Sequence, residues 1–375
     1  MFRAEELFRN VTDKNHPGET VLTIIQGRGT MPRDQAGRNI HYDDKSLGGY
    51  KRTERGDFII HLRSFEGGLE MTNETGIVSP AYTILRCKKP HASLFYNAYF
   101  HTDEFINHVL AKSVEGIRDG RQISFEAFKW LGIPYCCPAE QAKIAGLFAV
   151  LERRIEKQQQ LLDSLKKYKR GAVRTMLTPE SCKIEGAKWN YAQIGDLGTF
   201  LKGAPLSKAD IATEGTPFIL YGELYTTYTE VITAVARKTQ AAVEPQYFSK
   251  VGDVILPTSG ETPEEISTAS CVMLPNIILA GDLNIFRSTK IDGRIMSYIL
   301  NHVANGAVAR VAQGKSIVHV QASEISKIRI AYPDIETQKK MITVFDALTA
   351  MIDRNQKMLE WLQVQQKALL QQLFI

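Results

Sequence analysis

The sequence has no long apolar run and no cysteine framework. No run of apolar residues approaches the roughly 20 residues that a membrane-spanning helix needs. The N-terminal segment MFRAEELFRNVTDKNHP contains no apolar stretch of the kind found in signal peptides. The 5 cysteines form no C-x-x-C motif and are odd in number, which is typical of reduced thiols. The sequence therefore predicts a cytoplasmic protein without a membrane segment.

Motifs of the common enzyme classes are also missing. There is no Walker loop and no methyltransferase signature of the Asn/Asp-Pro-Pro-aromatic type, and Gly27-x-Gly29 lacks the third glycine of a dinucleotide-binding loop. His101 and His108 have no acidic or cysteine pattern around them that would complete a metal site. The turn at Ser259 has no nucleophile-elbow context. We therefore predict a non-catalytic protein that needs no cofactor and no metal.

Two long segments without internal proline dominate the rest of the sequence, residues 139–177 and 336–373. Their apolar residues recur with alternating spacings of four and three, the pattern of a coiled-coil seam. The first seam is Ile144, Phe148, Leu151, Ile155, Gln158, Leu162, Leu165, Lys169, Ala172 and Met176. The second is Met341, Phe345, Leu348, Ile352, Asn355, Leu359, Leu362, Gln366, Leu369 and Leu373, each 197 residues after its counterpart. Two ordinary core helices are the alternative, but such helices rarely keep a heptad through five repeats. The pattern predicts two helices, the first roughly 58 Å long.

Polar residues in the seam predict how the two helices pair. A polar seam residue costs stability unless it meets a polar partner, and so it fixes the register. For antiparallel helices, the register that satisfies every polar residue puts Gln158 against Gln366 and Lys169 against Asn355. This register leaves four seam residues that we expect to pack on the adjacent domains: Ile144, Phe148, Met341 and Phe345.

The segments that precede the two helices are alike. Strand-type runs are expected at 20–25, 58–62 and 77–85 in the first segment, and at 218–221, 253–256 and 272–274 in the second. Residues 93–112 have helical apolar spacing. The pentapeptides GDFII at 56–60 and GDVIL at 252–256 lie 196 residues apart. The chain is therefore a duplication of a mixed α/β domain followed by a long helix, and duplicated units tend to be related by a pseudo-twofold axis.

The net charge of +5 is unevenly distributed. Residues 139–184 contain ten Lys and Arg residues against five Asp and Glu residues, and the run Lys166-Lys167-Tyr168-Lys169-Arg170 is the densest part. A solvated helix face is the common explanation of such a run. A role facing phosphates or a partner becomes attractive only beside other motifs.

The order domain, helix, domain, helix, with Pro138-Ala139-Glu140-Gln141 opening the first helix, resembles the DNA-specificity subunit of Type I restriction–modification systems. The resemblance covers the whole chain and rests on an ordered set of pieces. These pieces are residues 56–60, 63–68, 76–82, 189–203, 221–225 and 259–262, and the helix endings at 169–171 and 371–374. The sequence departs from the family pattern in two places. The first domain lacks a full counterpart of the opening at 189–198, and the second helix begins Pro333-Asp-Ile-Glu-Thr-Gln rather than Pro-x-Glu-Gln.

The resemblance implies an α+β fold of two pseudo-twofold-related mixed α/β target recognition domains joined by two long antiparallel coiled-coil helices. The recognition domains would be residues 1–138 and 185–333, and the helices would lie within 139–184 and 334–375. Each domain would read one half of a split site in double-stranded DNA. The helices would fix the spacing and dock two methyltransferase subunits, through which restriction and translocase subunits would join. The subunit itself would perform no chemistry.

Candidate DNA-binding residues lie in loops of both domains, since Arg, Lys, Ser and similar side chains read base edges or hold phosphates. In the first domain they are Arg28, Arg33, Arg63, Ser64, Arg118 and Arg121. In the second they are Lys202, Tyr221, Tyr225, Ser259 and Lys315. Any one of them alone is a common surface residue, whereas the set on repeated loops favours DNA. The alternative function is a coiled-coil adaptor whose domains bind proteins, which predicts no salt-dependent affinity for DNA.

Overall fold

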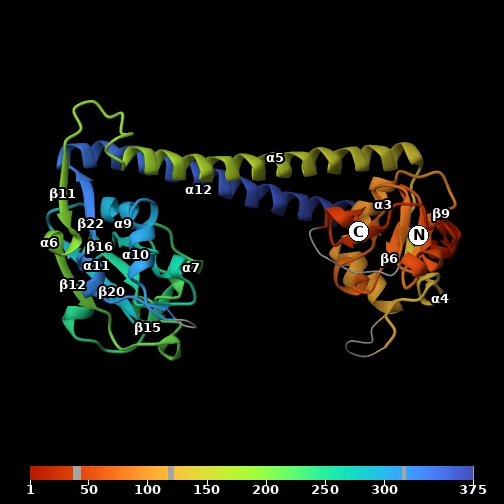
Figure 1. Cartoon of the computed structure of the whole chain (residues 1–375). Coiled ribbons are helices and arrows are strands. Elements are labelled where there is room, and N and C mark those ends of the chain that lie inside the picture. Colours follow the sequence, from red (N-terminus) through yellow and green to blue (C-terminus); the bar gives the residue numbers. More distant parts are fainter. Residues whose placement is uncertain (37–43, 117–121, 315–317, 375) are drawn as a thin grey trace. The chain divides into compact units, whose positions relative to one another are not determined.

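The computed structural model describes residues 1–36, 44–116, 122–314 and 318–374. The chain divides into two compact units: unit 1 is Met1–Gln160 with Asn355–Ile375, and unit 2 is Leu161–Arg354. Each unit thus combines a mixed α/β part with a portion of each long helix (Figure 1). In the described ranges, no helix has both the length and the apolar character needed to cross a bilayer.

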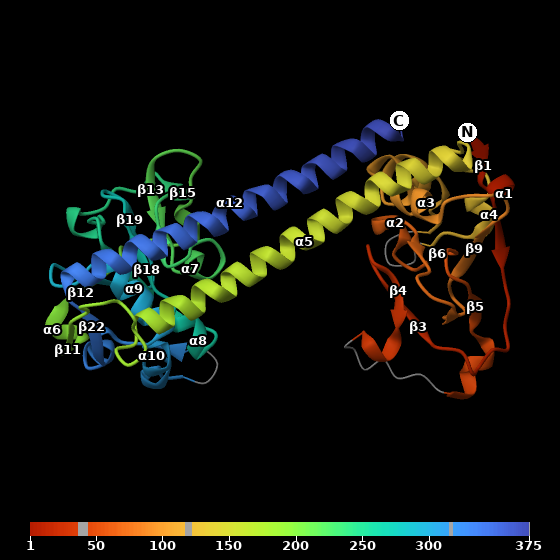
Figure 2. The same cartoon turned by 90° about the horizontal axis from the view of Figure 1, so that it is seen from above.

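The two long helices are α5 (Pro138–Met176) and α12 (Ile335–Leu373), each of 39 residues and each unbroken (Figures 1 and 2). This confirms both predicted helices to within one residue at each end. The predicted seam residues are buried or half-buried at every position except Leu373, which is 41% exposed. Within unit 1 the helices run antiparallel, because Gln158 contacts Asn355 while the ring of Phe148 stacks on Phe374 at 6.3 Å.

The predicted register of the helices is wrong. Gln158 pairs with Asn355, not with Gln366, which lies 11 residues or about three turns further along α12. The prediction assumed that both polar seam residues of α5 must be satisfied by the other helix. Lys169 instead forms an ion pair with Glu230, at 3.0 Å, from the mixed part of unit 2.

The four seam residues predicted to pack on the domains do so. Ile144 lies against the core of unit 1, and Phe148 is 3% exposed beside Phe374, which packs on the same core. Met341 and Phe345 are fully buried in the core of unit 2. The ring of Phe345 lies 4.7 Å from that of Tyr298.

Unit 1 is built on a four-stranded antiparallel sheet in the order β2-β9-β6-β7. Its strands are β2 (Phe8–Val11), β6 (Phe58–Ile60), β7 (Glu70–Met71) and β9 (Thr83–Cys87). Three strand pairs accompany it: β1 (Phe2–Arg3) with β10 (Gly132–Ile133), β3 (Leu22–Ile25) with β4 (Gly29–Pro32), and β5 (Lys51–Thr53) with β8 (Gly76–Val78). Between the sheet and α3 (Ser93–Phe100), the ring of Phe8 meets Tyr96 edge to face and the ring of Phe58 meets Phe100 edge to face.

Short helices fill the connections of unit 1. They are α1 (Ala4–Leu7), Arg33–Gln35, Asp44–Gly49, α2 (Ser64–Gly67), Glu104–Val109, Leu110–Ser113 and α4 (Phe125–Phe128). Two predictions need correction here. The single strand expected at 77–85 is two strands, β8 and β9, separated by a turn in which Tyr82 N–H donates to Ser79 at 3.1 Å. The helix expected at 93–112 is three helical pieces, with α3 ending at Phe100.

Unit 2 is built on a five-stranded sheet in the order β12-β20-β16-β18-β14. Its strands are β12 (Gly198–Lys202), β14 (Val231–Ile232), β16 (Asp253–Pro257), β18 (Ser270–Val272) and β20 (Leu283–Ser288). A second sheet contains β15 (Arg237–Thr239), β13 (Thr216–Ile219) and β19 (Ile278–Leu279). There are also two strand pairs. One is β11 (Trp189–Gln193) with β22 (Arg329–Pro333), and the other is β17 (Ser259–Gly260) with β21 (Val318–His319). The three strands expected in this domain are present as β13, β16 and β18, with ends shifted by one or two residues.

Helices of unit 2 cover the sheet and carry its loops. They are α6 (Ile194–Leu197), Lys208–Asp210, α7 (Glu223–Thr226), Pro245–Tyr247, α8 (Pro263–Ile266), α9 (Gly293–His302), α10 (Asn305–Val311) and α11 (Ala322–Ser326). The amphipathic α9 buries Ile295, Met296 and Ile299 in the same core as Val173 of α5.

The duplication inferred from the sequence extends to individual hydrogen bonds. Asp57 at the head of β6 receives two bonds from Arg86 on β9, at 2.9 and 2.7 Å. Asp253 at the head of β16 receives two from Arg287 on β20, at 2.7 and 2.6 Å. Both aspartates are almost fully buried, so each unit fixes its central strand with the same ion pair.

Glutamines in the first turn of each long helix are a second repeated device. Gln141 accepts from the Ala92 N–H at 3.0 Å and donates to the Cys136 carbonyl at 2.8 Å. Gln338 accepts from the Asp292 N–H at 2.9 Å and donates to the Pro333 carbonyl at 2.8 Å. The second long helix therefore begins with the same two glutamine hydrogen bonds as the first, although its opening sequence differs.

The N-terminal departure has a structural counterpart. The five-residue strand β11 pairs with β22 and leads into α6, and the two-residue β1 pairs with β10 and leads into α1 in the same way. The first unit thus contains this edge pair in a shorter form.

Candidate nucleic-acid interface

In unit 1, Arg28 lies at the tip of the β3–β4 hairpin. The prediction treated 27–33 as a loop, but Gly29–Pro32 is β4, paired with β3 from Ile25↔Gly29 to Leu22↔Pro32 (Figure 2). The Arg28 N–H closes a turn onto the Ile25 carbonyl at 2.9 Å, and Gly27 has φ 75° as the third residue of that turn. The Arg28 side chain is exposed.

Arg33 follows the hairpin and is half-buried. Its guanidinium carbon lies 6.0 Å from the centre of the Tyr50 ring, and its N–H donates to the Val21 carbonyl at 2.9 Å. The side chain therefore packs partly against the unit and offers less surface than Arg28 does.

Arg63 and Ser64 follow the central strand β6, at the start of α2. Arg63 is exposed, with its side chain 73% accessible and 4.0 Å from Glu66. Ser64 is fully buried, and its hydroxyl accepts from the His61 N–H at 2.9 Å. Ser64 thus presents no surface to a ligand in this conformation, and its role is to shape the loop that carries Arg63.

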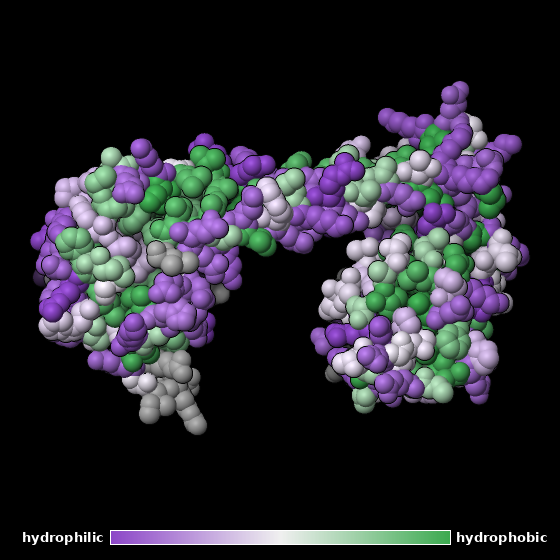
Figure 3. Space-filling model, turned by 180° about the vertical axis from the view of Figure 1, so that it is seen from behind, coloured by the Kyte–Doolittle hydropathy of each residue, from purple (hydrophilic) through white to green (hydrophobic). Residues whose placement is uncertain are grey.

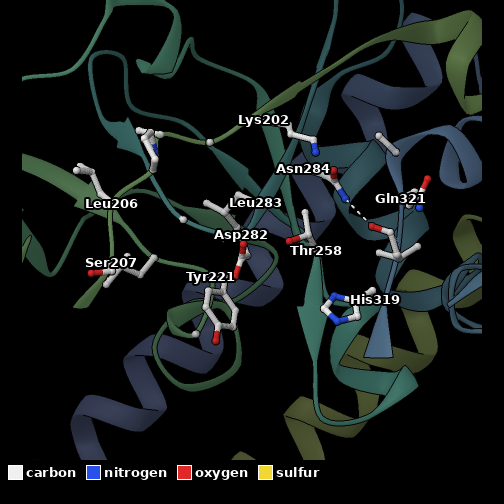
Figure 4. Close-up of a pocket in the computed structure, with 18 of the residues that line it drawn as sticks. Lys202, Leu206, Ser207, Tyr221, Thr258, Asp282, Leu283, Asn284, His319 and Gln321 are labelled. Carbon is white, nitrogen blue, oxygen red and sulfur yellow. Dashed lines mark hydrogen bonds between the residues drawn. The ribbon is translucent and has the colours of Figure 1, made fainter. Parts of the chain in front are cut away.

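In unit 2, the loop after the central strand β16 opens onto a cavity of about 1270 Å³. Predicted residues Lys202, at the end of β12, and Tyr221 line it (Figure 4). The remaining polar lining includes Ser207, Lys208, Thr258, Asp282, Asn284, His319 and Gln321. Amide, hydroxyl and cationic groups thus converge in one hollow, which suits hydrogen bonding to base edges and phosphates.

Backbone bonds hold the cavity wall together. The Thr258 N–H donates to the Asp282 carbonyl at 2.7 Å, and the Val320 N–H donates to the Thr258 carbonyl at 3.0 Å. Asn284 is 1% exposed and donates to the Val320 carbonyl at 3.2 Å. Asn284 therefore ties the strands together beneath the cavity, while Lys202, His319 and Gln321 are exposed around it.

Tyr225 and Ser259 lie beside each other outside this cavity lining. The Tyr225 hydroxyl donates to the Ser259 carbonyl at 3.1 Å, and burial raises the pKa of Tyr225 far above its ordinary value. The Tyr225 ring also meets that of Tyr221 edge to face at 6.5 Å. The hydrogen bond between Tyr225 and Ser259 stabilises the loop after β16, as the hydrogen bond of Ser64 stabilises the loop after β6.

Three predicted residues, Arg118, Arg121 and Lys315, lie outside the described residues. Sequence reasoning missed His319 and Gln321, which follow the Gln-Gly-Lys segment at 313–315 by a few residues. They lie around the same cavity as Lys202 because β21 pairs with β17. No local sequence pattern predicts this strand pairing. Among the described residues, no group of three or more His, Cys, Asp or Glu side chains is arranged to hold a metal.

Two copies of a mixed α/β domain, each with exposed polar side chains after its central strand and each followed by a long helix, define a duplicated architecture. Residues 187–363 match the family model of the Type I restriction modification DNA specificity domain. A comparison with curated protein sequences gives no match.

Solved structures of specificity subunits have the same fold over the whole chain. The HsdS subunit from Thermoanaerobacter tengcongensis has a TM-score of 0.50 at 15% identity, covering 100% of this chain and 95% of that one. The S subunit from M. genitalium has a TM-score of 0.58 at 14% identity, with coverage of 100% and 95%. A structure described as the basis of complex assembly and conformational transition of the type I R-M system has a TM-score of 0.60 at 15% identity, with coverage of 100% and 96%.

The second half of the chain thus matches the Type I DNA specificity domain, and the whole chain has the fold of solved specificity subunits, in agreement with the sequence resemblance.

Proposed function

We propose that the chain recognises a bipartite site in double-stranded DNA, with residues 1–138 reading one half and residues 185–333 the other. The observation that carries this proposal is the repeated construction of the central strand. In each unit a buried Asp–Arg pair fixes the head of the strand, and a loop with exposed polar residues follows its other end. Two loops at corresponding places of a duplicated chain suit a site in two halves.

The contacts in each half would come from different residue types. Unit 1 offers the exposed guanidinium groups of Arg28 and Arg63, which suit guanine edges or phosphates. Unit 2 offers Lys202, Tyr221, His319 and Gln321 around its cavity. Because the two surfaces differ, the two half-sites would differ in sequence.

We also propose that α5 and α12 form an antiparallel coiled coil whose length fixes the distance between the half-sites. The buried or half-buried seam and the Gln158–Asn355 pair support this proposal. Each helix contributes residues to both compact units, so a change in helix length acts on the chain between the two reading surfaces.

The same helices would dock two methyltransferase subunits, through which restriction and translocase subunits join. Exposed apolar residues recur on them at the repeat distance of 197: Leu147 (43%) with Val344 (41%), and Leu161 (47%) with Met358 (41%). Figure 3 shows a mostly hydrophilic helix surface with single apolar residues among the polar ones. Because these positions repeat at 197 residues, each copy of the repeat would offer one partner subunit the same positions.

The test is methylation mapping of the host genome with and without this gene. Loss of one methylated motif with two specific halves is expected on deletion. Complementation with Lys202→Ala should change only one half of that motif. Lys250→Ala removes another exposed lysine of unit 2 that does not line the cavity, and should leave the motif intact. A protein adaptor without DNA binding would leave every methylated motif unchanged on deletion.

A further inference from the structure

One buried carboxylate binds the backbone at the tip of the β3–β4 hairpin. Glu70 of β7 is 0% exposed, and its Oε1 accepts from the Gly27 N–H at 2.6 Å while its Oε2 accepts from the Gly29 N–H at 2.9 Å. These are the two backbone donors on either side of Arg28. A buried carboxylate that binds two N–H groups fixes the turn far more firmly than the turn alone would.

Asn73 binds carbonyl groups of the same tip. Its Nδ2 donates to the Arg28 carbonyl at 2.7 Å and to the Thr30 carbonyl at 2.9 Å, and its own N–H donates to the Thr30 hydroxyl at 3.0 Å. Gly29 has φ 79°, and a Cβ there would overlap the Met71 carbonyl oxygen. Arg28 is therefore the one residue of the tip with a long side chain free to extend outward, on a backbone bonded on both sides.

The contacts around Glu70 extend towards Arg63, the other exposed candidate arginine of unit 1. His101 lies with Nε2 3.2 Å from Oε1 of Glu70, and its other ring nitrogen meets the Asn97 carbonyl at 2.7 Å. The Nδ1 of His61 accepts from the Arg63 N–H at 3.3 Å, and burial lowers the pKa of the His61 side chain. The Gln26 side chain fills the space beside Gly67 of α2, so the hairpin tip and the Arg63 loop touch.

We propose that Arg28 is a specificity-determining residue of the first half-site, and that Glu70 and Asn73 are positioning residues that hold it ready for a guanine edge. The inference rests on the proposed reading of DNA by this unit. A guanidinium on a fixed backbone loses little freedom on binding, and its forked donors match O6 and N7 of guanine. A hairpin that only stabilised the fold would have no need to be held on both sides of an exposed arginine.

The experiment compares variants of the full chain in cells, by mapping the methylated motif and the fraction of sites methylated. Arg28→Lys keeps the charge and loses the forked donors, and should relax one guanine position of the first half-site. Selectivity at that position should fall about 5- to 150-fold, the range of one bidentate base contact. An unchanged motif in Arg28→Lys would overturn the specificity role of this residue.

Glu70→Gln and Asn73→Ala test the positioning role without touching Arg28. Both should relax the same position as Arg28→Lys and leave the second half of the motif unchanged. Glu74→Gln is the matched control, because Glu74 is exposed nearby and its loss removes the same charge but none of the bonds to the hairpin. Since Glu70 is buried, its variant can fail to fold, whereas Asn73 is exposed and its variant keeps the core intact.

The outcomes separate this inference from the proposed function. If the wild-type gene produces no bipartite methylated motif, the proposed function fails. If it produces one and Asn73→Ala and a folded Glu70→Gln both retain full selectivity, only the positioning role fails. Relaxation at a position in the second half, or uniform loss at all positions, would likewise contradict it.

Discussion

Gln158 donates through Nε2 to Oδ1 of Asn355 at 2.9 Å and to the Asn355 carbonyl at 3.0 Å, and each residue is the other's counterpart in the 197-residue repeat. The apolar seam residues Ile155 and Leu162 lie before and after this amide pair on α5. A polar pair of this kind fixes the register of two helices at some cost in stability.

Replacement of one amide should cost more than replacement of both. We expect Gln158→Leu to lower the free energy of unfolding by about 1–3 kcal/mol, because the two hydrogen bonds from Gln158 Nε2 to Asn355 are lost. The double variant Gln158→Leu with Asn355→Leu should restore stability to near the wild-type value. Denaturant unfolding of both singles and the double gives the coupling between them. Additive losses would show that the two amides do not act as a pair.

The buried ion cluster of unit 2 predicts a loss of stability in acid. Burial alone would raise the pKa of Glu230, but hydrogen bonds from His302 and Lys169 and the Lys169 charge lower it to about 2. Because this pKa lies below that of the unfolded chain, the stabilisation is present above about pH 4.5. It is lost as the pH falls from there towards 2, and amounts to on the order of 3 kcal/mol.

Lys169→Met should therefore reduce the dependence of the unfolding midpoint on pH between about 4.5 and 2. Lys167→Met is the control, since Lys167 is exposed on the same helix. Thermal unfolding followed by circular dichroism across this pH range measures both. Equal pH profiles for the wild type and the Lys169 variant would rule out the ion pair as the cause.

Arg63→Ala should impair recognition of one half-site by about 1–3 kcal/mol if the guanidinium contacts a base. The side chain is exposed beyond the central strand of unit 1, and its contact with Glu66 is long, at 4.0 Å. Competition binding on DNAs altered in one half-site at a time measures the effect. Arg55→Ala, which removes an exposed arginine outside these loops, sets the baseline for lost charge. Uniform weakening on all sequences, with a smaller salt slope, would instead identify a phosphate contact.

Lengthening both helices should lengthen the DNA spacer. One heptad inserted between Gln158 and Leu162, and one between Asn355 and Leu359, preserves the seam and adds roughly 10 Å to each helix. At ~3.4 Å per base pair, the methylated motif should gain about three base pairs of spacer. Seven residues inserted instead into the linker at 178–188 are the control and should leave the spacer unchanged. A constant spacer in the helix variant would contradict the proposed role of the helices.

The sequence by itself determined the two long helices, their seam and the duplication. Periodic apolar spacing is a local property, and it placed Leu162 and Leu359 in the seam and the ends of α5 and α12 within one residue. The GDFII and GDVIL segments likewise marked the two central strands. The buried Asp–Arg pairs at their heads needed the neighbouring strands β9 and β20, which lie about 30 residues away.

The register of the helices and the placement of the candidate interface residues were decided only by tertiary structure. Lys169 has the heptad position of a seam residue, but it forms its ion pair with Glu230 and not with the other helix. Ser64 is polar and lies in a loop, yet its hydroxyl is buried because it completes the turn after β6. Glu70 of β7 binds the backbone of residues 27 and 29, and the Gln26 side chain contacts Gly67 of α2. Contacts of this kind join residues far apart in the chain, so the spacing of residues in the sequence carries no record of them.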